Sequence, residues 1–187
     1  MRLTMSAVMV GLALSVTAAA QQPPVNPVGA AHKAFLDRLQ EYVQYRNKVD
    51  TGIPALKETN DPAKIAEREK ALGDALIKGR PDAKLGDYFV RPIQPILIKM
   101  IHDDFAKRSR LDRKALIVEL PKGVKVVVNA RYPTTIPLAT FPPNLLEELP
   151  QLPKGLEYRI VGRDLILLDV SGNVVVDIMP NVFPIPT

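Results

Sequence analysis

The chain of 187 residues contains no cysteine and no tryptophan, and only ten of its residues are phenylalanine or tyrosine. Without cysteine, no disulfide can cross-link the fold, and no lipid can be attached as in a bacterial lipoprotein. The scarcity of aromatic rings argues against a sugar-binding cleft built on stacking. Stability must therefore come from a packed core, which a mature chain of about 165 residues can supply.

Sequence signatures of common catalytic sites are also missing. No serine lies in a G-x-S-x-G motif, and Gly162 and Gly172 fit turns rather than a phosphate-binding loop. The acidic residues do not combine into the two facing carboxylates that a glycosidase needs. We predict that the protein is not an enzyme and needs no cofactor. A hydrolase with an unrecognised site is one alternative.

His102, Asp103 and Asp104 form the only local cluster of potential metal ligands. Adjacent residues on a helix point about 100° apart, so these three cannot all reach one ion. His32 could join them if its helix packed beside theirs. A metal-binding sensor or chaperone that uses these four residues is a second alternative, although solvated polar residues near a helix end are the simpler interpretation.

Residues 1–20 have the pattern of a cleaved secretory signal peptide. Arg2 is the short positive region, residues 5–16 are the apolar run, and small residues at 18–20 fit the cleavage site. We expect export to a bacterial periplasm or beyond, with no membrane span after cleavage. A proline-rich lead at residues 21–28 follows.

Amphipathic helices are predicted at residues 29–50, 62–78 and 93–107, within a helical region at residues 29–110. Apolar residues recur there at helical spacing, and Asp61-Pro62 is typical of a helix start. The net charge of the whole chain is +5, and charges of both signs alternate along these segments. This mixture predicts solvated helix surfaces rather than nucleic-acid binding.

A β-rich region is predicted at residues 111–187, forming one domain with the helices. Residues 116–120 and 124–128 have the pattern of a hairpin, and residues 132–153 are rich in proline. Residues 156–179 predict a three-stranded meander with turns at Gly162-Arg163 and residues 170–173. The predicted register opposes Tyr158 to Leu167 in the first hairpin.

This register divides the meander into two faces. The first is apolar and needs a covering layer: it comprises Tyr158, Ile160, Leu165, Leu167, Val176 and Ile178. The second is mixed and is our candidate contact surface: it comprises Glu157, Arg159, Ile166, Val175 and Asp177. Its apolar members suit a protein partner or self-association. The alternative is that helices of the same chain pack onto this face.

Two stretches of the chain resemble known proteins. They are LEYRIVGRDLILLDVSGNVVVDIMPNVFP at residues 156–184 and KGRPDAKLGDYF at residues 78–89. They resemble a group of uncharacterised secreted bacterial proteins that have a helical N-terminal half and end in an LEYRxVxRDLxLxDV-type β-meander. The resemblance implies export and a fold, and it implies no activity.

Together these features predict an α+β protein with about three helices and a small antiparallel sheet of about five strands. The function that they favour is that of an exported envelope protein acting as a non-enzymatic binding or structural module.

Overall fold

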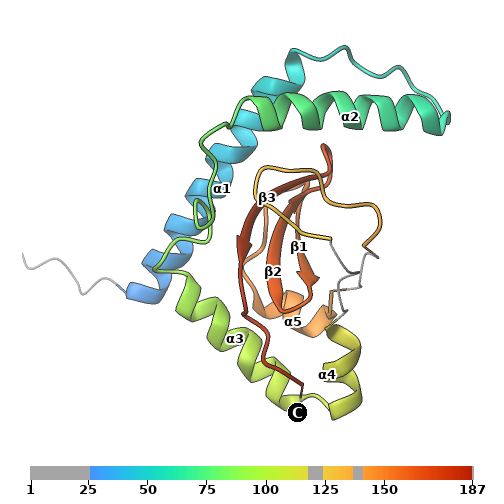
Figure 1. Ribbon diagram of the computed structural model, residues 1–187. Coiled ribbons are helices and arrows are strands. Elements are labelled where there is room, and N and C mark those ends of the chain that lie inside the picture. Colours follow the sequence, from blue (N-terminus) through green and yellow to red (C-terminus); the bar gives the residue numbers. More distant parts are fainter. Residues whose placement is uncertain (1–25, 118–123, 137–140, 187) are drawn as a thin grey trace, which may run out of the picture.

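A computed structural model describes residues 26–117, 124–136 and 141–186. Within these ranges five helices are followed by one antiparallel sheet of three strands (Figure 1). The α+β class predicted from the sequence is therefore confirmed. None of the helices in these ranges is long and apolar enough to cross a membrane.

The first two helices, α1 (Pro27–Thr51) and α2 (Pro62–Lys78), begin at the same kind of signal. Asn26 and Asp61 accept hydrogen bonds from first-turn amides at 3.1 and 3.0 Å. Each is followed by a proline, whose missing N–H is not needed in the first turn. Because Asn26-Pro27 supplies this signal, α1 begins two residues before the predicted start.

Three shorter helices follow: α3 (Gln94–Lys107), α4 (Arg110–Leu116) and α5 (Pro143–Glu148). The sequence did not predict α4, which begins where Ser109 accepts a hydrogen bond from the Asp112 amide at 3.2 Å. Residue 116, the expected start of a hairpin, ends this helix instead. The centre of that hairpin, residues 118–123, lies outside the described ranges, and residues 124–127 form no strand.

The sheet has the order β1 (Leu156–Val161), β2 (Asp164–Asp169) and β3 (Val174–Met179). The turn between β1 and β2 places Gly162 at φ +57°, as the first central position of a type II′ turn requires. Tyr158 lies opposite Leu167, so the predicted register of this first hairpin is confirmed.

The register of the second hairpin is only partly as predicted. Leu168 lies opposite Val175, as the predicted turn at residues 170–173 requires, but the pairing then shifts by one residue, so that Leu167 opposes Asp177. Val176 is the extra residue of a β-bulge, and beyond it the side chains change faces. The expectation that Asp177 lies on the same face as Arg159 and Ile166 is wrong for this reason.

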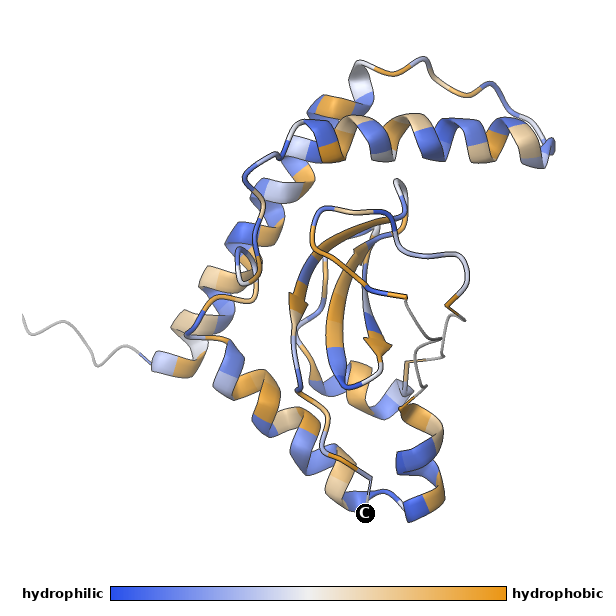
Figure 2. Ribbon diagram, viewed as in Figure 1, coloured by the Kyte–Doolittle hydropathy of each residue, from blue (hydrophilic) through white to orange (hydrophobic). Residues whose placement is uncertain are grey.

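Both faces of the sheet are covered. On one side the strands pack against α1, α3, α5 and the link before α3, which comprises residues 79–93. Figure 1 shows α2, α1 and α3 following one another around the sheet. Residues 124–136 cover the other side with apolar side chains, and they also run along the outer edge of β3, where the Val175 amide donates to the Ala130 carbonyl at 2.9 Å. Hydrophobic residues therefore dominate the strands along their length (Figure 2).

Candidate functional site

An open groove of about 720 Å³ lies between α5 and the first half of β1. Its floor consists of buried apolar side chains of the core, and it includes Phe141, Leu149, Leu156 and Tyr158. Leu146 on α5 forms a wall and keeps 49% of its surface exposed. An apolar hollow of this size is typical of a binding site.

The position of α5 creates this groove. Leu145 is fully buried and anchors the short helix in the core. Because neighbouring residues on a helix diverge by about 100°, Leu146 points away from the core and lines the groove. After α5 the chain returns beside β1, where the Tyr158 hydroxyl donates to the Pro150 carbonyl at 3.1 Å. Burial raises the pKa of Tyr158 above its ordinary value.

The rim of the groove is polar and carries Glu147, Gln151, Glu157 and Arg159. The Arg159 guanidinium donates to the Glu157 carboxylate, which lies two residues away on β1. Both side chains also line a second hollow of about 520 Å³ on the opposite face of the sheet, beside Tyr132 and Ile136. The groove thus combines an apolar floor with a charged rim, as protein-binding surfaces do.

The five residues of the predicted contact surface do not form one exposed face. Glu157 and Arg159 lie on the rim of the groove, but Ile166 and Val175 are 1% and 0% exposed beneath residues 124–136. Packing within the chain, the alternative, therefore accounts for these two, although the covering element is this segment rather than a helix. Asp177 is also fully buried, because the bulge places it opposite Leu167.

Asp177 binds the link that precedes α3. Its carboxylate accepts hydrogen bonds at 2.8 Å from the backbone amides of Gly86, Tyr88, Phe89 and Ile178. Burial raises the pKa of Asp177, and these amide donors act in the opposite direction. The contact joins β3 to the link, and we interpret it as structural. The residues next to Asp177 in the sequence do not distinguish it from a surface aspartate.

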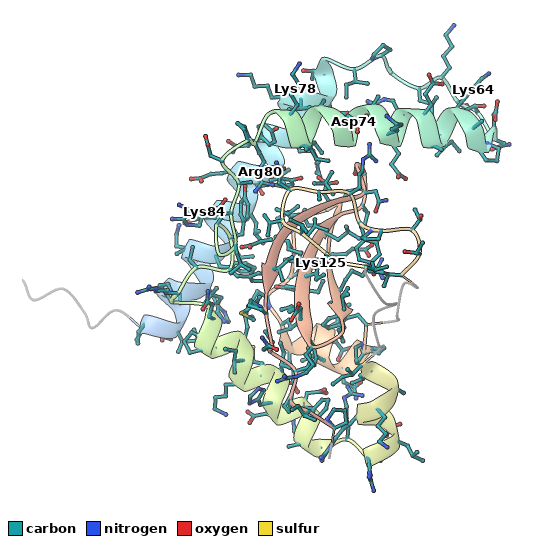
Figure 3. All side chains as sticks on the ribbon, viewed as in Figure 1. Lys64, Asp74, Lys78, Arg80, Lys84 and Lys125 are labelled. Carbon is teal, nitrogen blue, oxygen red and sulfur yellow. The ribbon has the colours of Figure 1, made fainter. Side chains whose placement is uncertain are left out.

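A second buried polar cluster joins α1 to the sheet. The Tyr42 hydroxyl donates to Asp169 at 2.9 Å, and burial raises the pKa of both groups above their ordinary values. Arg80 lies with its guanidinium 5.3 and 5.2 Å from the ring centres of Tyr42 and Tyr88, where α1 meets the link after α2 (Figure 3). Sequence reasoning missed this cluster, because its members are far apart in the chain.

Alkaline pH should destabilise the fold through its buried tyrosines. The pKa of Tyr42 and of Tyr158 is raised from 10.0, so both phenols stay neutral in the folded protein. The free energy of unfolding should be unaffected below pH 10.0 and should fall above it, by about 1.4 kcal/mol per pH unit for each such tyrosine. Urea unfolding at a series of alkaline pH values measures this slope.

Tyr158→Phe should reduce that slope, because one of the two tyrosines is then absent. Phenolate absorbance gives an independent check, since some of the five tyrosines should ionise only as the protein unfolds. Ionisation of all five in the folded state would contradict the expectation.

The four residues of the metal alternative have other partners or lie apart. Asp103 pairs with Lys99 at 2.6 Å, Asp104 pairs with Arg108 at 2.6 Å, and His102 Nε2 lies 2.9 Å from the Val182 carbonyl oxygen. Within the described ranges no group of three or more histidine or acidic residues is placed to hold a metal ion. The Nε2 atom of His32 is buried and has no hydrogen-bond partner among the described residues.

Comparisons with protein-family models, with curated proteins and with solved structures gave no match. The resemblance to secreted bacterial proteins therefore stays a prediction, and the function has to be argued from geometry.

Proposed function

We propose that the protein is an exported, non-enzymatic binding module that holds a segment of a protein partner in the groove between α5 and β1. The observation that carries this proposal is the groove itself, about 720 Å³ of open space over buried apolar side chains. Export remains a prediction from residues 1–20.

The exposed wall of the groove supports a role in binding. Leu146 stands half-exposed beside buried Phe141 and Leu149, so a partner would cover an apolar surface that is now in water. Each Å² of apolar surface removed from water contributes about 25 cal/mol to binding before its entropic costs.

The neighbouring strand favours a polypeptide as the ligand. β1 is an edge strand, because its only strand neighbour in the described sheet is β2. Edge strands present backbone groups to which an extended segment can bond, while adjacent pockets receive its side chains. Four consecutive residues of β1, from Leu156 to Arg159, line the groove, so such a segment would run along this edge.

Leu146→Glu should weaken binding by about tenfold or more, because it places a charge in the apolar wall, and tenfold corresponds to about 1.4 kcal/mol. The probe is a set of linear peptides selected from a random library on the purified protein. Their affinities for the wild type and the variant are compared by fluorescence anisotropy.

Leu85→Glu is the matched control, since Leu85 is 55% exposed in the link before α3 and does not line the groove. Circular dichroism establishes that both variants fold. Equal affinities of the selected peptides for all three proteins would refute the proposed site.

A further inference from the structure

We infer that the segment bound in the groove carries lysine or arginine beside its apolar residues. This inference rests on the proposed function and names the chemistry of its partner. The rim carries two carboxylates, those of Glu147 and Glu157, and one guanidinium, that of Arg159.

The guanidinium is already compensated. Arg159 donates to Glu157, and its side chain is only 19% exposed, so it offers little free positive charge to a ligand. Glu148, the other acid of α5, pairs with Lys107 at 3.6 Å. Glu147 is exposed and has no ion-pair partner within the described part of the chain. The uncompensated charge at the rim is therefore negative.

This local charge is opposite to that of the whole chain, which is +5. A basic ligand would be attracted to the rim, whereas an acidic one would be repelled by it. Lysine and arginine also suit the shape, because their aliphatic stems can lie on the apolar wall while their charged ends reach the carboxylates. A serine side chain can do neither.

The test uses the selected peptides in three versions, in which the residues flanking the apolar positions are lysine, serine or glutamate. The lysine version should bind the wild type about two- to fivefold more tightly than the serine version, as expected of an exposed ion pair. The glutamate version should bind more weakly than the serine version. Raising the salt concentration should reduce both differences.

Substitutions on the rim then identify the charges responsible. Glu147→Gln should remove most of the preference for lysine. Glu157→Gln should shift the preference toward glutamate, because it frees the Arg159 guanidinium. Glu67→Gln is the control, since Glu67 is an exposed residue of α2 that does not line the groove.

The outcomes separate this inference from the proposed function. One outcome would overturn the inference and leave the proposed binding site intact. In it, the Leu146→Glu variant no longer binds the peptides, but the wild type binds their lysine, serine and glutamate versions equally. A preference for glutamate in the wild type would overturn it as well. Binding that is insensitive to Leu146→Glu would remove the basis of both.

Discussion

Asp177→Ala should destabilise the protein by about 3–5 kcal/mol, because buried amide donors left without an acceptor cost about 1–3 kcal/mol each. The carboxylate accepts from four backbone amides, three of them in the link at Gly86, Tyr88 and Phe89. Without it, three amides of the link lose their acceptor on β3, while the Arg80 side chain still donates to the Val176 carbonyl at 3.3 Å. Urea unfolding followed by circular dichroism measures the loss.

Asp177→Asn distinguishes the loss of a hydrogen-bond acceptor from the loss of side-chain volume. The amide keeps one oxygen that can accept, so this variant should lie between the alanine variant and the wild type. Asp103→Ala is the surface control, because Asp103 is an exposed aspartate paired with Lys99, and it should change stability little. A loss below about 1 kcal/mol in Asp177→Ala would show that the amides find other acceptors.

Gly73→Ala should destabilise the protein by about 1–3 kcal/mol, although alanine favours helix. A Cβ atom at Gly73 would lie 2.2 Å from the Gly172 carbonyl oxygen and 2.6 Å from the Arg131 Cζ atom. The first of these is backbone in the turn between β2 and β3, so α2 would have to move away from the sheet. Thermal and urea unfolding both measure the change.

Gly29→Ala is the matched helical control. A Cβ atom there would meet nothing closer than 3.7 Å, so alanine should stabilise α1 by about 0.4–1 kcal/mol. Equal effects of the two substitutions would contradict the close approach of α2 to the sheet.

The first hairpin could be predicted residue by residue because its signals are local. Gly162 supplies the positive φ of a two-residue turn, and polar residues alternate with buried ones along β1. Turn length and alternation together leave one register. The result is that Tyr158 was placed correctly opposite Leu167.

The second hairpin could not be predicted in the same way. All six residues of β3 are buried, so neither face is marked by polarity, and a bulge leaves no trace in such a sequence. Asp177 is the one polar residue of this strand, and its charge predicts a place on the mixed face. The structure buries it instead, because amides from a link about 90 residues earlier in the chain satisfy its carboxylate.

Of the residues that line the groove, only two on its rim could be singled out from the sequence. Glu157 and Arg159 stood out as charged residues on a strand, and the structure places both beside the groove. The apolar floor depends on how residues 141–152 return across β1, which is a tertiary arrangement. Leu146 carries no local signal that separates it from a core leucine.

The most direct test of the account is to map where the selected peptides bind. Backbone amide chemical shifts of the ¹⁵N-labelled protein would be followed as an unlabelled peptide is added. The account predicts that the largest changes fall on α5, on the residues that follow it up to 152, and on β1 from Leu156 to Arg159. Changes confined to another surface, such as the hollow lined by Tyr45, Arg80 and Tyr88, would contradict it.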